Sequence, residues 1–412
     1  MDGLLTNPFL KKARTVFAVL GGVYVVAVGL LTIPYFQGHT IYLNAVRIPW
    51  FADFDAPERY GLSPNKTYNF KIQTSDNETL GSWFILSDRQ YQSIPFPPQS
   101  PELLISDAVR GSPTILFLHG NAATRAFNAR VQHYQAYSSR LHANVLAIDY
   151  RGFAESSGAP SEDGLVRDAR AAWEWLISQG AKGEDILIVG HSLGTGVGAR
   201  LAAELSDEGV NYRGVVLMSP FSSIEEVLKT YNVFGAVPLM KPLSMIPYAA
   251  NVVTWALIHK FDTISVIPRI KGEVTIAHAG QYDRSFACCV LSLFVENDWD
   301  IPYTHSETLF NAFLEPHLPT VKLPTNPAAL SKDEWASFTS QVSARKERRE
   351  ELVTQTKLAN FGSVEEFTDG NRDVMFVKLF AGGHDLVGVQ EGLQDIIGTK
   401  YGFIRERKLI LD

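Results

Sequence analysis

The chain has 412 residues, of which 46% are hydrophobic and 11% aromatic, so it can bury one substantial core without division into two equal domains. Its net charge of -7 is not gathered into a basic stripe, and nothing in the sequence indicates nucleic acid as a partner. The two cysteines, Cys288 and Cys289, are adjacent in the sequence. Neighbouring cysteines rarely form a structural bridge, so the chain has no disulfide framework.

The first element in chain order is an uncharged apolar run over residues 16–33. The run is longer than the apolar region of a typical signal peptide, which favours an uncleaved transmembrane anchor over a cleaved signal or a buried core helix. We give this anchor the bounds 16–36. Basic residues concentrate on its N-terminal side, so the positive-inside rule places residues 1–15 in the cytoplasm. We expect the rest of the protein to be lumenal, with the endoplasmic reticulum as the membrane that holds it.

A short connection and one large domain are expected after the anchor. Residues 37–65 are expected to form a linker, and residues 66–412 a single folded domain. The aromatic segment 48–51 in this linker suits either the membrane interface or packing on the domain. Two Asn-x-Thr triplets, which begin at Asn65 and Asn77, are compatible with a glycoprotein whose domain is lumenal.

The domain begins with a pattern typical of two antiparallel strands, residues 67–74 and 79–86, joined by a polar turn. From residue 114 onward, near-continuous apolar runs alternate with amphipathic helical segments. Such runs are typical of a parallel sheet that helices cover on both faces. The sequence therefore predicts an α/β fold with a mostly parallel, doubly wound sheet. The expected strands of this sheet are residues 114–118, 144–148, 185–189, 214–218, 290–295 and 374–380.

The third of these strands leads into Gly190-His191-Ser192-Leu193-Gly194, and small and apolar residues at helical spacing follow. A sharp turn between a strand and a helix exposes a serine hydroxyl to a general base above the sheet. The flanking glycines stand where side chains would collide, and the N-terminus of the helix offers N–H groups to a developing negative charge. Ser192 is therefore the candidate nucleophile.

A serine nucleophile needs an imidazole that accepts its proton and a carboxylate that orients the imidazole. Two polar clusters follow predicted strands, at the edge where open α/β sheets bind their ligands. The later cluster contains His384, which is the candidate base. The earlier cluster contains the competing candidates for the acid, Glu296, Asp298 and Asp300. His119 precedes the serine in the chain, and a structural role suits it better than that of the base.

Taken together, these residues resemble the α/β-hydrolase superfamily and, within it, the membrane-anchored monoacylglycerol and lysophosphatidylserine lipases of the ABHD12 type. The resemblance extends over about residues 110–310 and 370–400, and it includes the single N-terminal anchor. The motifs that carry it are His119-Gly120-Asn121, Asp149-Tyr150-Arg151-Gly152-Phe153, Gly190-His191-Ser192-Leu193-Gly194-Thr195-Gly196, Ser219-Pro220-Phe221, Glu296-Asn297-Asp298-Trp299-Asp300-Ile301-Pro302 and Gly383-His384.

The resemblance implies an α/β-hydrolase fold with a cap insertion, and hydrolysis of a carboxylic ester that has a single fatty acyl chain. It assigns the nucleophile to Ser192 and the base to His384. The family's spacing assigns the acid to Asp298, with Asp300 as the fallback. The expected product of the first half-reaction is an acyl-enzyme on the serine.

The same resemblance implies where the oxyanion hole lies and which partners to expect. The backbone N–H groups of Asn121 and Leu193 occupy the two positions that this fold uses. Neither a metal nor an organic cofactor is implied. The expected partners are the bilayer and a single-chain lipid ester, either a monoacylglycerol or a lysophospholipid.

Three segments are expected to be insertions in the domain. Residues 221–270 take the place of the cap, and their many apolar side chains suit an acyl-chain pocket, a membrane-facing lid or packing on the core. Residues 271–288 add a polar detour without a clear period before the strand expected at 290–295. Residues 314–371 contain a helix rich in both signs of charge, which is typical of a solvated face.

Two other functions compete with lipid ester hydrolysis. The first is a protein deacylase or thioesterase, but cytosolic deacylases of related type have acylated cysteines near the N-terminus, and this chain has no cysteine before Cys288. The second is a membrane-tethered scaffold that uses the hydrolase fold without turnover. The presence of every residue that the chemistry needs argues against the scaffold.

Overall fold

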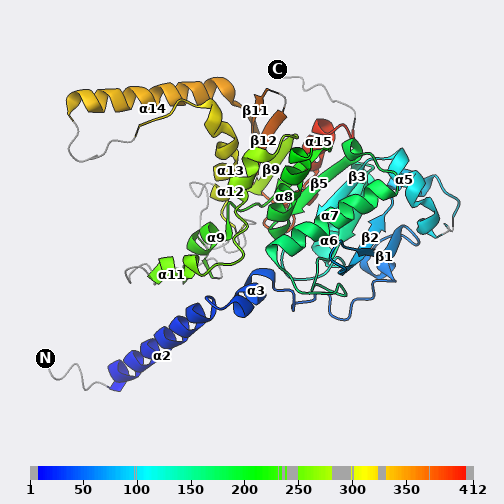
Figure 1. The fold of residues 1–412 in the computed structure, drawn as a ribbon, viewed down its shortest axis with the longest axis horizontal. Coiled ribbons are helices and arrows are strands. Elements are labelled where there is room, and N and C mark those ends of the chain that lie inside the picture. Colours follow the sequence, from blue (N-terminus) through cyan, green and yellow to red (C-terminus); the bar gives the residue numbers. More distant parts are fainter. Residues whose placement is uncertain are drawn as a thin grey trace.

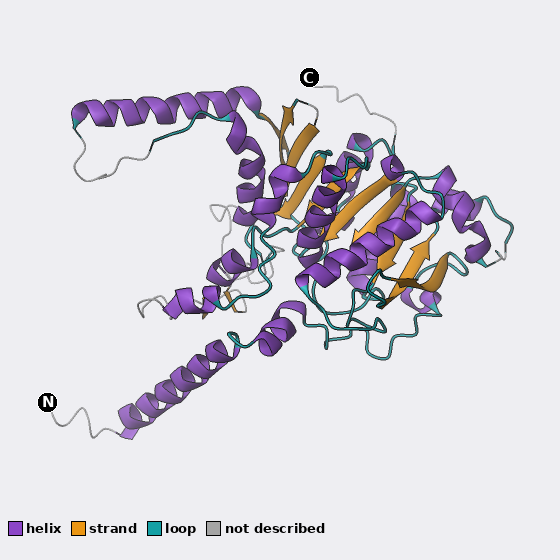
Figure 2. Cartoon of the chain, in the orientation of Figure 1, coloured by secondary structure: helices purple, strands orange, loops and turns teal. Residues whose placement is uncertain are grey.

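The computed structural model describes residues 8–96, 98, 100–230, 232–233, 237–238, 249–280, 298, 301–322, 331–370 and 372–404. One large sheet forms the centre of the molecule, and helices pack against it (Figures 1 and 2). Two long helices, α2 (Pro8–Leu30) and α14 (Lys332–Leu352), project away from this body (Figure 1).

Helix α2 corresponds to the apolar run at the N-terminus. Residues Lys11–Leu30 have a mean hydropathy of 1.8, and only 6% of this stretch is buried within the protein. The helix is therefore long and apolar enough to cross a membrane, which fits the predicted single transmembrane helix. A short turn leads from it into α3 (Pro34–Tyr42), which lies against the domain (Figure 1).

The sheet has ten strands in the order β1-β2-β4-β3-β5-β6-β9-β12-β11-β10. The strands from β4 to β12 in this order run parallel, and the strands at each edge are antiparallel to their neighbours. This arrangement confirms the predicted α/β class. The strands are β1 (Thr67–Gln73), β2 (Thr79–Ile85), β3 (Thr114–Leu118), β4 (Asn144–Ile148), β5 (Ile186–His191), β6 (Gly214–Met218), β9 (Val274–Ala279), β10 (Thr354–Leu358), β11 (Gly362–Asp369) and β12 (Arg372–Leu379).

Helices cover both faces of the sheet. Alternate residues of a strand point to opposite faces, so each buried strand contributes side chains to two core clusters. In β3, Leu116 and Leu118 join a core cluster with side chains of α7 and α8, whereas Ile115 and Phe117 join one with α6 and α15. Besides its α-helices, the domain contains the short strand pair β7 and β8. These elements are α4 (Asp88–Gln92), α5 (Ile105–Gly111), α6 (Asn128–Arg140), α7 (Glu162–Ser178), α8 (Leu193–Asp207), α9 (Ile224–Thr230), β7 (Asn232–Val233), β8 (Val237–Pro238), α11 (Ala249–Trp255), α12 (Thr263–Val266), α13 (Thr304–Leu314) and α15 (Glu391–Lys400).

One strand lies where the sequence predicted a polar detour. Residues 271–288 were expected to precede the strand, but β9 begins at Val274 and fills the sheet position between β6 and β12. Its polar residues Thr275 and His278 are fully buried, and each has a hydrogen-bond partner far along the chain. Because polar residues interrupt the buried strand β9, its sequence lacks the continuous apolar run by which the other central strands are recognised. The strand predicted at residues 290–295 lies outside the described residues.

The segment 314–371 contains the predicted charged helix and two strands that were not predicted. The helix is α14, and Ser331 caps it by accepting a hydrogen bond from the Glu334 N–H, while the Glu334 carboxylate accepts one from the Ser331 N–H. Strands β10 and β11 follow and extend the sheet beyond β12 in antiparallel fashion. Many residues of both strands are polar and exposed, which is why hydrophobic pattern alone does not find them.

A buried ion pair joins β4 to the loop after β3. The Arg125 guanidinium donates to the Asp149 carboxylate at 2.5 Å, and the Arg125 backbone N–H donates to the same carboxylate at 2.7 Å. Both side chains are fully buried. The guanidinium also contacts Glu155 at 2.6 Å and lies over the Phe54 ring at 3.8 Å. The Arg125 guanidinium is thus paired with two carboxylates, of which that of Asp149 is fully buried.

We predict that Arg125→Met destabilises the protein by about 3–5 kcal/mol, because it leaves the Asp149 carboxylate buried without its cation. The matched control is Arg59→Met, which breaks the exposed pair between Arg59 and Asp53 and is expected to cost less than about 1 kcal/mol. Urea unfolding in detergent, followed by tryptophan fluorescence, measures both values. Equal effects of the two substitutions would contradict the importance of the buried pair.

Candidate active site

Ser192 occupies the turn between β5 and α8 in a rarely populated backbone conformation, with φ 51° and ψ -119°. Such a conformation costs of order 1–3 kcal/mol and persists only where the surroundings enforce it. The enforcing contacts are close approaches of the chain. A Cβ atom on Gly194 would lie 2.0 Å from the Leu118 carbonyl oxygen, and one on Gly190 would lie 2.4 Å from the Gly194 carbonyl oxygen. Only glycine fits at either position, so the sequence of the turn fixes its shape.

His384 and Asp298 are hydrogen bonded although 86 positions separate them in the chain. The His384 Nδ1 lies 2.8 Å from one carboxylate oxygen of Asp298, and the Ile301 backbone N–H donates to the other at 2.8 Å. Only 1% of the Asp298 side chain is exposed. Burial acts to raise the pKa of Asp298, but the charge of His384 and the hydrogen bonds from His278 and His384 prevail and hold it far below its ordinary value. The competing candidates Glu296 and Asp300 lie outside the described residues.

His278 is a site residue that the sequence did not reveal. Its Nε2 lies 3.2 Å from the Asp298 carboxylate and 2.9 Å from the Ile301 carbonyl oxygen, and its Nδ1 lies 2.7 Å from the Ser306 hydroxyl. With the proton on Nε2, His278 donates to both oxygens and accepts from the serine. The residue stands near the end of β9, in the stretch that was expected to be a detour. Recognition of that strand would have been the only signal for it.

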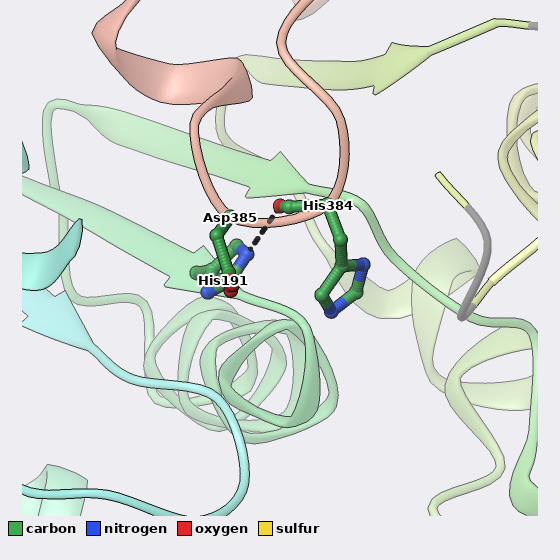
Figure 3. Close-up of side chains that lie close together, drawn as sticks. All are labelled: His191, His384 and Asp385. Carbon is green, nitrogen blue, oxygen red and sulfur yellow. Dashed lines mark hydrogen bonds between the residues drawn. The ribbon is translucent and has the colours of Figure 1, made fainter. Parts of the chain in front are cut away.

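Two further histidines hold the loop that carries His384. The His191 Nε2 donates to the His384 carbonyl oxygen at 2.8 Å, and the His133 Nε2 donates to the Asp385 carbonyl oxygen at 2.9 Å. Figure 3 shows the first of these bonds, with the His384 imidazole turned away from it. Burial lowers the pKa of His133 to about 4 and lowers that of His191 well below its ordinary value. Both rings are therefore neutral near pH 7.

The side chains of His191, His384 and Asp385 lie close enough together to suggest a metal site (Figure 3). The hydrogen bonds give a better account of this cluster. The His191 Nε2 donates a proton to the His384 carbonyl oxygen, and the His384 Nδ1 is engaged by Asp298, so hydrogen bonds within the protein hold both rings in place. We assign no metal to these residues.

The loop after β3 is held against Ser192 by a buried arginine. We call residues 119–124 the oxyanion loop. A Cβ on Gly120 would lie 3.1 Å from the Ser192 Cβ, so the loop approaches the serine closely. The Arg130 Nη2 donates to three consecutive carbonyl oxygens of this loop, those of Gly120 at 3.1 Å, Asn121 at 3.0 Å and Ala122 at 2.8 Å.

Arg130 also sets the direction of the Asn121 N–H, one of the two predicted oxyanion-hole donors. In a trans peptide the N–H points opposite to the C=O, so the N–H of Asn121 points away from Arg130. Within the described part of the chain, the N–H groups of Asn121 and Leu193 donate to no other backbone group. Both N–H groups are therefore free to serve as the oxyanion-hole donors that the family resemblance implies, and that assignment stays a prediction.

A pocket of about 190 Å³ opens over these groups. Ser192, His384 and Asn121 all line it, together with Arg130 and His133. His119, the rejected candidate for the base, is buried and is not among the lining residues. The remaining lining residues are Ile48, Phe117, Gly120, Ala122, Ala123, Phe127, Ala129, His191 and Asp385.

Comparisons with known proteins identify the family that the chain resembles. Residues 113–234 match the family described as alpha/beta hydrolase fold. The chain is 30% identical over 301 residues to the lysophosphatidylserine lipase ABHD12 of Danio rerio, an alignment that covers 73% of this chain and 72% of the relative. It is 32% identical over 303 residues to the ABHD12 lipase of Bos taurus, with coverage of 73% and 69%. A solved alpha-beta hydrolase from Vibrio vulnificus is 20% identical, with a TM-score of 0.43 over 60% of this chain and 76% of that one.

The buried neutral histidines predict a loss of stability in mild acid. A histidine in the unfolded chain takes up a proton below about pH 6.5, whereas folded His133 does so only near pH 4. The unfolded state therefore binds more protons between these values, and stability falls as the pH is lowered through this window, by roughly 3 kcal/mol for His133 alone. Above pH 6.5 both states are neutral and this contribution is absent.

We expect His133→Gln, which keeps a hydrogen-bond donor but does not titrate, to show a shallower fall in the free energy of unfolding between pH 6.5 and 4.5. Urea unfolding at four pH values in this window measures the slope. The exposed His142→Gln serves as the control and should follow the wild type. A parallel pH dependence of wild type and His133→Gln would refute the assignment.

Proposed function

The chain belongs to the ABHD12-like α/β hydrolases, and from this premise we propose that it cleaves carboxylic esters of single-chain lipids through Ser192, Asp298 and His384. The protein is a lipid ester hydrolase of the lipase or esterase type. One observation carries the catalytic assignment. The serine of the strained turn and the histidine paired with a buried carboxylate line the same pocket.

In this mechanism the Ser192 Oγ attacks the ester carbonyl carbon, and the His384 Nε2 accepts the hydroxyl proton. The negative charge that develops on the carbonyl oxygen is stabilised by the N–H groups of Asn121 and Leu193. The bond to the alcohol then breaks, and His384 returns the proton to the departing oxygen. Water attacks the acyl-enzyme with His384 again as the base, which releases the fatty acid and restores the serine.

Asp298 acts on the imidazole, not on the substrate. Its carboxylate accepts the His384 Nδ1–H, which keeps the proton off the nitrogen that faces the serine and stabilises the imidazolium that forms. The low pKa of Asp298 keeps it ionised throughout. His278 lies 3.2 Å from the same carboxylate oxygen that His384 contacts, so two histidines hold the acid in place.

The lipid nature of the substrate is supported by the relatives and by the surface near the anchor. Both compared relatives are named lysophosphatidylserine lipases. The cap segment presents exposed apolar side chains, Val252 at 55%, Trp255 at 84% and Ile258 at 54% exposure. Val28 of α2 packs against Val253 of the same segment. A membrane helix in contact with an apolar cap suits a substrate with one acyl chain that enters from the bilayer.

We expect Ser192→Ala to abolish labelling by a fluorophosphonate probe and hydrolysis of lysophosphatidylserine in native membranes. His384→Ala should lose about as much activity, and Asp298→Asn should lower kcat by up to about 10⁴-fold, because the wrong imidazole tautomer is favoured. Ser265→Ala, at an exposed serine, is the control and should label fully. Persistent labelling of Ser192→Ala would exclude Ser192 as the nucleophile, and turnover of palmitoyl thioesters but not of lipid would favour a deacylase.

A lumenal domain also predicts which asparagine carries a glycan. Asn77 is exposed in the turn between β1 and β2, whereas the Asn65 Nδ2 already donates to the Pro98 carbonyl oxygen at 2.9 Å. We therefore expect Asn77→Gln to remove a glycan that endoglycosidase H cleaves, and Asn65→Gln to change little. Electrophoretic mobility after expression in mammalian cells measures this. Absence of glycan from the wild type and both variants would argue for a cytoplasmic domain.

A further inference from the structure

The segment between the membrane helix and the first strand is in contact with the active site. We call residues 34–48 the strap. Three consecutive N–H groups of the oxyanion loop donate to carbonyl oxygens of the strap. The pairs are Ala122 N–H with the Tyr42 oxygen at 2.9 Å, Ala123 N–H with the Val46 oxygen at 2.6 Å, and Thr124 N–H with the Ile48 oxygen at 3.1 Å.

These hydrogen bonds support a strained part of the oxyanion loop. Ala122 and Ala123 both have positive φ angles, 53° and 51°, in a region that residues other than glycine seldom adopt. Each such residue costs energy that its surroundings must offset. Arg130 holds the loop through carbonyl oxygens on one side, and the strap holds it through N–H groups on the other. The strap also supplies Ile48 to the wall of the pocket.

The other end of the strap is bound to the membrane helix and to the cap. Gln37 in α3 is only 2% exposed, and its Nε2 donates to the carbonyl oxygens of Leu31 at 3.0 Å and Ala256 at 3.1 Å. The Gln37 Oε1 accepts a hydrogen bond from the Ile258 N–H at 2.7 Å. One glutamine thus ties the end of the anchor region to the segment that follows α11.

The middle of the strap is packed into the domain. Tyr42 is fully buried, with its ring edge-on to His259 at 5.3 Å and Phe261 at 6.2 Å between centroids. The Asn44 Nδ2 donates to the Gly152 carbonyl oxygen at 2.9 Å, in the loop after β4. The sequence predicted a linker over residues 37–65; in its first part, Gln37 and Tyr42 are buried and Asn44 is hydrogen bonded to the domain, while the side chains between them are half-buried or exposed.

We propose that the strap is a positioning element: its main-chain carbonyl oxygens fix the oxyanion loop in its active conformation, and Gln37 joins the strap to the cap and to the end of helix α2. The proposal rests on the proposed function of Ser192 and the oxyanion loop. Gln37 and Asn44 are positioning residues in this view, since neither lines the pocket. Their loss should weaken stabilisation of the transition state more than binding of the substrate, because the oxyanion forms only during the reaction.

The test is the double variant Gln37→Ala with Asn44→Ala in the full chain, purified in detergent. With a soluble short-chain ester, we expect kcat to fall about tenfold or more with KM unchanged, less than the roughly 10²–10³-fold loss on removal of an oxyanion donor outright. Labelling by the fluorophosphonate should slow by the same factor. The control is Tyr42→Phe, which keeps the buried ring and removes a hydroxyl that has no partner among the described residues. Unchanged kcat in the double variant would overturn the proposal.

Hydrogen exchange provides a readout that is independent of turnover. The peptide that covers residues 119–127 should exchange faster in the double variant than in wild type or Tyr42→Phe, while peptides of β5 and β6 should be unchanged. Faster exchange throughout the domain would mean that the double variant is destabilised in general. In that case Asn44→Ala alone must show faster exchange confined to residues 119–127, or the proposal fails. If wild type were not labelled at Ser192, the proposed function would fail, but the exchange result would still decide whether the strap holds the loop.

Discussion

The close packing of the turn at Ser192 against the end of β3 is the constraint on which the site depends. The backbone of Gly194 lies so near the Leu118 carbonyl oxygen that no side chain fits between them. This contact brings α8 onto the sheet directly beside the oxyanion loop, and it forces Ser192 into a conformation that isolated chains avoid. Ser192, the proposed nucleophile, and its two predicted N–H donors are therefore positioned by backbone contacts within three adjacent elements, β3, β5 and α8.

Around this turn, buried polar groups hold the other residues of the site in place. Some of these groups are neutral and others are ionised. His133 and His191 are kept neutral by burial and donate to main-chain carbonyl oxygens of the loop that carries His384. Asp298 stays ionised because His278 and His384 supply the hydrogen bonds and the charge that offset its burial. Because His133 and His191 are neutral and donate to main-chain oxygens, they hold the loop without adding a charge next to the pair of Asp298 and His384. The low-dielectric interior strengthens these interactions and makes their loss costly.

The proposed strap does more than connect α2 to the domain. A tether that only held the enzyme at a membrane would need no contact with the oxyanion loop, yet residues from Gln37 to Ile48 reach the cap, the core and the loop in turn. Helix α2 contacts the cap as well, through Val28 and Val253. The candidate site, the cap segment and helix α2 thus belong to one connected set of contacts.

The sequence by itself determined the elements whose signal is local. These elements are the continuous apolar strands β3, β4 and β6, the glycine-flanked turn at Ser192 and the apolar run of α2. Burial on both faces requires consecutive apolar residues, and a position without room for a Cβ requires glycine, so each pattern can be recognised within a few residues. Only the tertiary structure decided the rest. Strand β9 lies in the stretch expected to be a polar detour, since Thr275 and His278 are buried through partners that lie far away in the chain. The roles of Arg130 and of the strap likewise depend on hydrogen bonds to main-chain atoms, which every residue possesses and no sequence pattern distinguishes.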